Sequence, residues 1–331
     1  MRLIGLAVIL AVYLLAPGAA EVQEAPKVYR VGTLRQGLPP APGSQPGILQ
    51  ETLHKALHDL GYIEGRNIVF DHRYAEGKNE RFSSLAAALV ALKPDVVIAE
   101  TTPAVIAAMH ATATIPIVMV NVSDPVASGL VASLARPGGN VTGVADYGTE
   151  MQIKGVELLR TAVPKTKRLA ALMSDNPVHA AQLKTVQDAA RSLGLTVLPS
   201  IVKSLEEFEG AFASMKRGNA DALIVFGGAP FGTPAQRDKL IELAAKAKLP
   251  TMYRGRWWVE AGGLLSYGGI ALNRLSSVAT YVDKILKGAK PGDLPIEQPT
   301  KFELVINMKT AKALGLTIPQ TLLQRADQVI E

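Results

Sequence analysis

The chain has 331 residues, of which 48% are hydrophobic and 19% charged, a composition typical of globular proteins and long enough for two hydrophobic cores. The absence of cysteine excludes disulfides, thiolate metal sites and a cysteine nucleophile. The formal net charge of +6 is spread along the chain without interleaved basic and aromatic residues, so we expect a solvated basic surface and no nucleic-acid partner.

Residues 1–20 have the pattern of a secretory signal peptide. Arg2 supplies the charged region, Leu3–Leu15 the apolar region, and Pro17–Ala20 the small residues before a cleavage site. The apolar region is shorter than the ~20 residues that span a membrane, although an uncleaved anchor is the alternative. No cysteine follows this region to accept a lipid. We therefore expect a periplasmic protein of a Gram-negative cell that is not lipid-anchored.

The first half of the chain alternates short apolar runs with helical patterns, in the order βαβαβαβ. Strands are predicted at Tyr29–Leu34, Asn67–Tyr74, Val96–Ala99, Ile117–Val120 and Asn140–Val144, and helices at Ile48–Leu60, Arg81–Leu92 and Val126–Leu134. Asn67–Tyr74 alternates apolar and polar residues, as a strand at the margin of a sheet does. This order predicts a doubly wound parallel sheet.

The second half repeats the alternation and predicts a second α/β lobe of similar size. Its predicted strands are Arg168–Met173, Thr196–Val202, Ala222–Phe226, Pro250–Tyr253 and Phe302–Asn307, and Gly263–Tyr267 is either a strand or a segment that crosses between the lobes. Its predicted helices are Glu150–Thr161, Val178–Leu193, Leu205–Lys216, Ala235–Ala247 and Leu272–Lys287.

Four strands are followed by a polar residue and a proline, at Asp124-Pro125, Thr102-Pro103, Asn176-Pro177 and Thr233-Pro234. Aspartate, threonine and asparagine are good N-caps, and proline suits the first turn of a helix. Each unit places a polar side chain at the carboxyl end of a strand, the edge where ligands bind in open α/β sheets. Two such units in each half predict two facing rims around a cleft.

Two long stretches resemble one protein family. PIVMVNVSDPVASGLVASLARPGGNVTGV at Pro116–Val144 is similar to the signature of ABC-transporter substrate-binding proteins related to the tryptophan/tyrosine-binding lipoproteins, and Gly262–Pro319 matches the same family. The resemblance covers roughly residues 27–331. It implies a type I periplasmic-binding-protein fold, an α/β fold with two doubly wound parallel-sheet lobes joined by a three-segment hinge.

In that fold the chain crosses between the lobes three times, which we expect near Gly143–Tyr147, Ser266–Gly269 and Gln298–Lys301. Lobe 1 is then residues 27–145 plus 269–297, and lobe 2 is residues 146–268 plus 298–331. Gly143, Tyr147 and Gly268 are the expected hinge residues, because glycine accommodates the dihedral changes of a moving hinge.

Motifs of several enzyme classes are missing from the sequence, including the nucleophile elbow, the P-loop and the dinucleotide fingerprint. Gly227–Gly232 follows a strand, but Pro230 breaks a phosphate-cradling turn, so a mobile loop fits better, with contact to the ligand as the alternative role. His54 and His58 have the i, i+4 spacing of zinc ligands but lack the accompanying glutamate and a third ligand, so we interpret them as a solvated helix face. We expect no catalytic residue, no metal and no cofactor.

Residues at strand ends are the candidates for ligand binding. Asp124 is either a helix cap alone or, as the resemblance implies, also a ligand contact. Glu100 directly follows an apolar strand and needs a partner, which is a ligand amine or Arg35 on the neighbouring loop. Trp257 and Trp258 either pack on the lobe or form a stacking wall for a planar ligand. The full set of candidates is Arg35, Glu100, Thr101, Thr102, Ser123, Asp124, Ser174, Asp175, Asn176, Gly228, Tyr253, Trp258 and Tyr267.

The resemblance implies the periplasmic solute-binding component of an ABC importer. Such a protein clamps a small solute, here an amino acid or an aromatic acid, between its lobes and presents the closed form to an ABC permease in the inner membrane. We expect a monomer without enzymatic activity. A sensor that feeds a membrane receptor is the alternative with the same fold, and a secreted α/β enzyme is a weaker one. A sugar-responsive repressor is excluded, because its DNA-binding helix-turn-helix does not fit in the short leader.

We predict that the exported protein begins near Glu21, because the small residues of a signal peptidase site end at Ala20. Expressed in a Gram-negative host, it should be found in the periplasmic extract with the mass of residues 21–331. Intact-mass measurement of that extract checks this. Retention of residues 1–20 in the membrane fraction would show an uncleaved anchor instead.

Overall fold

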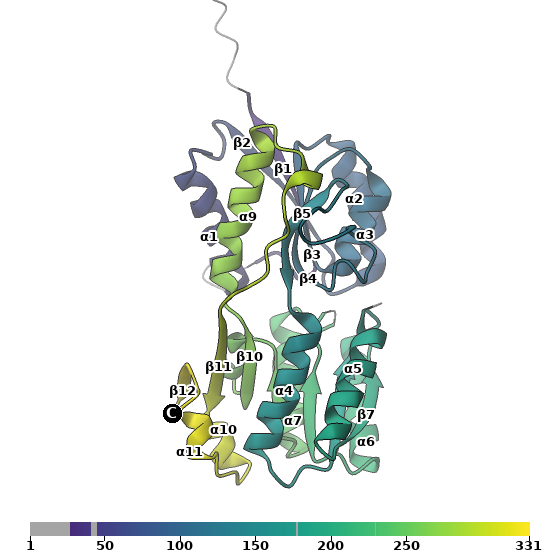
Figure 1. The fold of residues 1–331 in the computed structure, drawn as a ribbon, viewed down its shortest axis with the longest axis vertical. Coiled ribbons are helices and arrows are strands. Elements are labelled where there is room, and N and C mark those ends of the chain that lie inside the picture. The colour runs from purple at the N-terminus through teal and green to yellow at the C-terminus, as the bar shows by residue number, and fades with distance from the viewer. Residues whose placement is uncertain (1–26, 41–44, 177, 229) are drawn as a thin grey trace, which may run out of the picture.

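The computed structural model describes residues 27–40, 45–176, 178–228 and 230–331, so the predicted signal peptide lies outside the described residues. The chain forms two α/β lobes, one above the other in Figure 1, each built on its own sheet. The fold class predicted from the sequence is thereby confirmed. Within the described part of the chain, no helix combines the length and the apolar character that a membrane span requires.

The first sheet has five parallel strands in the order β2-β1-β3-β4-β5. They are β1 (Tyr29–Arg35), β2 (Ile68–Tyr74), β3 (Val96–Glu100), β4 (Ile117–Ser123) and β5 (Val141–Asp146). Helices α2 (Phe82–Ala91) and α3 (Thr102–Ala111) cover one face, and α1 (Gln45–Asp59) and α9 (Ala271–Leu286) cover the other. Because both faces are covered, the central strands are almost continuously apolar. Strand β2 lies at the sheet margin as predicted, but its burial does not alternate, because every residue after Ile68 is half-buried.

The second sheet has seven strands in the order β12-β11-β10-β9-β8-β6-β7. They are β6 (Arg168–Met173), β7 (Thr196–Ile201), β8 (Ala222–Val225), β9 (Thr251–Tyr253), β10 (Leu265–Gly269), β11 (Phe302–Asn307) and β12 (Gln328–Ile330). One face carries α4 (Gly148–Ala162), α5 (His179–Ser192), α10 (Met308–Ala313) and α11 (Gln320–Leu323), and the other carries α6 (Phe208–Arg217), α7 (Pro234–Lys246) and α8 (Arg256–Glu260). Strand β11 runs antiparallel to β10, so this sheet is mixed rather than wholly parallel.

The predicted helix at Val126–Leu134 is wrong. Residues 125–129 form hydrogen-bonded turns, in which the Ser128 amide donates to the Asp124 carbonyl at 2.9 Å. Asp124 and Gly129 have left-handed φ values of 48° and 69°, which interrupt a right-handed helix. The short elements α8, α10, α11 and β12 were not predicted, because none of them is long enough to show a hydrophobic period.

The chain passes between the lobes three times. It crosses at Tyr147 between β5 and α4, at Ile270 between β10 and α9, and at residues 298–301 before β11 (Figure 1). Helix α9 therefore packs on lobe 1 although it follows a strand of lobe 2, and Glu297 still pairs with Val144 of β5. Each lobe is consequently assembled from separate segments of the chain.

Two of the three expected hinge residues lie inside strands. Gly143 is part of β5, has a φ of 128°, and leaves room for a close approach of β4, since an added Cβ would lie 2.4 Å from the Met119 carbonyl oxygen. Gly268 is part of β10, and its Cβ would lie 2.1 Å from the Arg254 carbonyl oxygen. Close backbone packing therefore explains both glycines, and Tyr147 alone of the three lies between two elements.

We predict that Gly143→Ala lowers the free energy of unfolding by about 2 kcal/mol or more, because it combines a steric conflict with an unfavourable dihedral angle. Urea denaturation measures this loss as a lower midpoint of unfolding, provided that the m-value is the same as in the wild type. Gly139→Ala is the matched control, because nothing lies within 4 Å of a Cβ added there. Equal midpoints for the two variants would contradict the packing explanation.

Candidate functional site

The two lobes meet at the carboxyl edges of their sheets. Asn79, just after β2, donates to Asp175 after β6 at 3.3 Å. Asp124, just after β4, accepts hydrogen bonds from two residues of lobe 2. In open α/β sheets this edge is where ligands bind, so the residues that end the strands are placed to contact anything held between the lobes.

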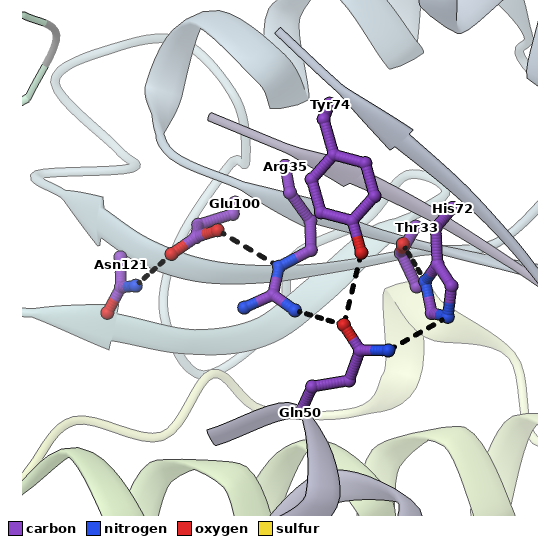
Figure 2. Close-up of polar contacts among 7 residues, drawn as sticks. All are labelled: Thr33, Arg35, Gln50, His72, Tyr74, Glu100 and Asn121. Carbon is purple, nitrogen blue, oxygen red and sulfur yellow. Dashed lines mark hydrogen bonds and ion pairs between the residues drawn. The ribbon is translucent and has the colours of Figure 1, made fainter. Parts of the chain in front are cut away.

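A chain of polar contacts runs along the lobe 1 edge (Figure 2). Arg35 Nε at the end of β1 lies 3.5 Å from Glu100 Oε2 at the end of β3, and Asn121 Nδ2 donates to Glu100 Oε1 at 3.0 Å. The predicted partner Arg35 is therefore present. The distance from Arg35 Nε to Glu100 Oε2 exceeds the roughly 2.7–2.9 Å of a strong charge-assisted hydrogen bond. The Glu100 carboxylate therefore keeps acceptor capacity for a further donor.

Gln50 of α1 connects this edge to β2. Its Oε1 accepts from Arg35 Nη1 and from the Tyr74 hydroxyl, each at 3.1 Å, and these two donors fix the orientation of the amide. Gln50 Nε2 then donates to His72 Nε2 at 3.3 Å, so the His72 proton lies on Nδ1 and is donated to Thr33 Oγ1 at 2.7 Å. Burial lowers the pKa of His72 to about 4, so the ring is neutral at pH 7, as this arrangement requires.

Beside these contacts a cavity of about 60 Å³ lies between the sheet and helices α1 and α9. Its volume is several times the roughly 10–15 Å³ that holds one water molecule. The polar lining residues are Thr33, Arg35, Gln50, His54, His72, Glu100 and Asn121, and the apolar ones are Leu53, Ile98, Val120, Leu275 and Val278. Apolar walls with a few convergent polar groups are typical of small-molecule sites.

Thr101 has two features of a functional residue. Its φ of 82° and ψ of 155° lie in a region that β-branched residues rarely occupy. Its Oγ1 is buried and has no hydrogen-bond partner among the described residues. Thr101 precedes α3 but makes no side-chain cap, and Thr102 follows it in the buried first turn. A free hydroxyl at a helix N-terminus suits an anion such as a carboxylate.

Asp124 reaches across to lobe 2 and does not cap a helix, contrary to the sequence-based expectation. Its Oδ2 accepts from Thr149 Oγ1 at 2.8 Å and from Gln182 Nε2 at 3.3 Å. The adjacent Ser123 is buried against Gly148, where an added Cβ would lie 2.4 Å from the Ser123 side chain. Asp124 therefore bonds across the interface between the lobes, and Ser123 packs against it.

The facing edge of lobe 2 brings three predicted residues together. A Cβ added to Gly228 would lie 3.0 Å from Ser174 Oγ and 3.9 Å from Asn176 Nδ2. His179 supports this group by donating from Nδ1 to the Ser174 carbonyl at 3.0 Å, and burial lowers its pKa to about 4. Asp175 is exposed at the same edge, where it accepts the hydrogen bond from Asn79.

Tyr253 and Trp258, which the sequence placed at the ligand, lie in the core of lobe 2. Their rings stack with centroids 4.9 Å apart and an angle of 11°, and both side chains are buried between the sheet and helices α6 to α8. Packing therefore accounts for both, and we correct their assignment to the ligand site. Trp257 stacks under the guanidinium of Arg237, with its ring centroid 4.9 Å from Cζ.

Tyr267 belongs to an aromatic cluster at the hinge. Its ring stacks on Phe302 at 5.8 Å, and Phe302 lies 5.6 Å from the ring of Tyr147. Tyr147 lies on the first crossing, whereas Tyr267 in β10 and Phe302 in β11 lie in the strands next to the second and third crossings. The cluster therefore packs beside the crossings, and Tyr267 itself lies inside a strand of lobe 2.

The sequence did not predict five members of the lobe 1 network, namely Thr33, Gln50, His72, Tyr74 and Asn121. One signal was available, because Phe70, His72 and Tyr74 alternate along β2 and so share one face. His54, expected on a solvated helix face, instead stacks on Phe70 with centroids 4.2 Å apart. Among the residues that the structure describes, no group of three or more His, Asp or Glu side chains could hold a metal ion.

Comparison with known proteins gives one family. The ABC transporter substrate binding protein family matches residues 45–330 of the chain. A tyrosine-binding protein of Clostridioides difficile (strain R20291) is 33% identical over 273 residues, which cover 79% of this chain and 75% of that protein.

Two solved structures are informative together. The ABC domain from Streptococcus pneumoniae in complex with L-Trp is 28% identical, has a TM-score of 0.83, and covers 92% of this chain and 100% of that one. A ligand-free, open structure of a substrate binding protein with adhesive properties from Clostridium difficile is 27% identical and has a TM-score of 0.63. The match covers 92% of this chain and 99% of that one. The lobes described above are therefore arranged more like those of the tryptophan complex, in agreement with their hydrogen bonds across the interface.

We predict that Asp124→Ala lowers the affinity for a small molecule held between the lobes by roughly tenfold or more. The variant removes the acceptor of two hydrogen bonds between the lobes, and bonds to a charged group contribute about 1.5–3 kcal/mol. Titration calorimetry measures the loss. Asp188→Ala on the exposed side of α5 is the control.

Asp124 could act on affinity as a contact between the lobes or as a direct contact with the ligand. A double-mutant cycle that combines Asp124→Ala with Thr149→Val distinguishes these two roles. If Asp124 acts as a contact between lobes, the two substitutions are strongly non-additive. If it touches the ligand directly, Thr149→Val alone leaves the affinity unchanged, and that result would contradict the arrangement described here.

Proposed function

Because the chain belongs to the family of ABC transporter substrate binding proteins, we propose that it is the periplasmic solute-binding component of an ABC importer, with an aromatic L-amino acid as its solute. The tyrosine-binding relative and the tryptophan-bound structure support this class of solute. In this proposal residues 1–20 direct export and are removed, and the mature monomer stays free in the periplasm. It binds the solute without changing it and delivers it to a permease in the inner membrane.

The observation on which the proposal mainly rests is the unpaired hydroxyl of Thr101. A carboxylate held there would receive the hydroxyl hydrogen bond together with amide hydrogens from the first turn of α3, whose cap site is not filled by a side chain. Glu100 precedes Thr101 and keeps acceptor capacity, so it can accept from an ammonium group. Adjacent sites for an anion and a cation fit the zwitterionic end of an amino acid.

The two lobes act as jaws in this proposal, with residues 27–145 and 269–297 in one and residues 146–268 and 298–331 in the other. Thr101 and Glu100 belong to the first jaw, and Ser174, Asn176 and Gly228 follow strands β6 and β8 at the carboxyl edge of the second. A ligand that touches both edges binds more tightly to the closed form than to the open form, and this difference in affinity drives closure. The permease can then distinguish loaded from empty protein by shape.

Titration calorimetry of the purified protein against the common L-amino acids and a set of aromatic carboxylic acids tests the proposal. We expect an aromatic amino acid to bind most tightly. Small-angle scattering at saturation should show a smaller radius of gyration than without ligand. A folded protein that binds no member of the panel would contradict the proposed function.

We predict that Thr101→Val weakens binding of the preferred amino acid by roughly tenfold or more without destabilising the free protein. The substitution keeps the β-branched shape but removes a hydroxyl that donates to a charged carboxylate, a bond worth about 1.5–3 kcal/mol. In the free protein that hydroxyl is buried and unpaired, so its loss should leave the melting temperature unchanged or higher.

Thr185→Val on α5 is the matched control, because the hydroxyl of Thr185 bonds within its own exposed helix. Calorimetry and thermal unfolding of both variants are compared with the wild type. A lowered melting temperature with unchanged affinity in Thr101→Val would show that its hydroxyl serves the fold and not the ligand.

A further inference from the structure

The side-chain amide of Gln50 is held at both ends by strand β2. Its Nε2 donates to His72 Nε2 at 3.3 Å, and its Oε1 accepts from the Tyr74 hydroxyl at 3.1 Å (Figure 2). The His72 ring is itself fixed, because it stacks on the rings of Phe70 and His54 at angles of 4° and 14°. An amide that is anchored at both ends has little freedom to turn, so Gln50 presents Oε1 in one direction.

The same oxygen atom of Gln50 divides the bonds of Arg35. Arg35 Nη1 donates to Gln50 Oε1 at 3.1 Å, whereas Arg35 Nε lies 3.5 Å from Glu100 Oε2. Figure 2 shows Gln50 and Glu100 on opposite sides of the guanidinium group. A full approach of Arg35 to Glu100 would therefore stretch its bond to Gln50. Arg35 stays short of the strong bidentate pair that arginine forms with carboxylates, in which both bonds are roughly 2.7–2.9 Å long.

Glu100 is consequently a carboxylate whose charge is only partly matched. Its Oε1 accepts from Asn121 Nδ2 at 3.0 Å, and its Oε2 has the long contact with Arg35. The Glu100 side chain is 27% exposed and lines the cavity beside the lobe 1 edge, so a molecule in that cavity can reach it. In a closed bidentate pair with Arg35, the same carboxylate would offer a ligand less charge and fewer free lone pairs.

We propose that Gln50 is a positioning residue for the ammonium group of the ligand: by holding Arg35 at a distance from Glu100, it keeps the Glu100 carboxylate available to accept from that group. The inference rests on the proposed function, in which Glu100 receives the ammonium end of an amino acid. The preference of the site for an α-amino acid over the 2-hydroxy acid with the same side chain then depends on a residue that acts through Arg35.

Ligands that differ only at the α-carbon substituent measure this effect. L-Tyrosine carries an ammonium group where L-3-(4-hydroxyphenyl)lactic acid carries a hydroxyl group, and L-tryptophan and L-indole-3-lactic acid form a second pair with another ring. Titration calorimetry gives the amine preference, which is the ratio of the two dissociation constants within a pair. We expect the wild type to prefer the amino acid by roughly tenfold or more, because a bond between charged groups is stronger than one from a neutral hydroxyl.

Substitutions of Gln50 separate positioning from packing. Gln50→Met should reduce the amine preference by roughly fivefold or more, because Arg35 is then free to pair fully with Glu100. Gln50→Glu keeps an acceptor for Arg35 and should keep the preference at the wild-type level or above it. Lost packing, or a lost contact with the rest of the ligand, would weaken both members of a pair alike and leave the ratio unchanged. A preserved ratio in folded Gln50→Met would overturn the inference.

Two further variants support this comparison. Gln320→Met, at an exposed position of α11 in lobe 2, is the matched control and should leave both affinities unchanged. Gln50→Ala takes the place of Gln50→Met if the latter does not fold, and the same loss of preference is expected from it.

A double-mutant cycle with Arg35→Met tests whether Gln50 acts through Arg35. In the Arg35→Met background, Gln50→Met should change the amine preference by no more than about twofold. An equal loss in both backgrounds, or a wild type that binds amino and hydroxy acids equally well, would overturn the inference and leave the proposed function standing. A folded wild type that binds neither amino acid would overturn the proposed function and this inference with it.

Discussion

A half-buried carboxylate at the end of an apolar strand needs hydrogen-bond donors close by to balance its charge. The residues of the lobe 1 edge are arranged to meet this requirement at Glu100. Its two partners, Arg35 and Asn121, come from the two strands that flank β3 in the sheet. Arg35 in turn is held by Gln50, which brings α1 and, through His72, the marginal strand β2 into the same network. Removal of any one partner would leave a half-buried charge or donor unpaired, which is more costly than the bond itself. The edge is therefore fixed before a ligand arrives, and little ordering is needed when one binds.

Much of the fold follows from the sequence, because parallel strands covered on both faces are apolar along their whole length. This pattern located β6 and β11 to the residue, and it placed Glu100 and Thr101 at a strand end, where the structure also has them. The mixed pairing of β11 could not be predicted, since strand direction depends on where a distant segment returns after α9. The helix expected after Asp124 is absent because the backbone is left-handed at Asp124 and Gly129, and the Asp124 side chain bonds to Thr149 and Gln182 of the other lobe instead of capping a helix.

The sequence predicted those residues of the candidate site that stand at the ends of strands. It did not predict residues whose contribution depends on the direction in which the side chain points. Tyr253 ends a strand, yet the alternation of side chains along β9 sends its ring into the core against Trp258. Gln50 and His72 contribute through the middle of an element, so no terminal position marks them in the sequence. The packing of His54 on Phe70 was not predicted either, because the spacing of His54 to His58 suggested a solvated helix face.

Helix α9 closes one face of lobe 1, yet in the chain it follows the strands of lobe 2 up to β10. Lobe 1 has all five of its strands once Asp146 has been synthesised, but Val278 and Val282 of its core arrive much later. The sheet of lobe 2 is in turn incomplete until β11 and β12 have been synthesised. Neither lobe can complete its core as an independent unit during synthesis, and contacts of such long sequence separation form slowly. A chain threaded through a translocation pore must remain unfolded until it has passed, so this order of synthesis favours the export that we propose by delaying stable structure until nearly the last residue.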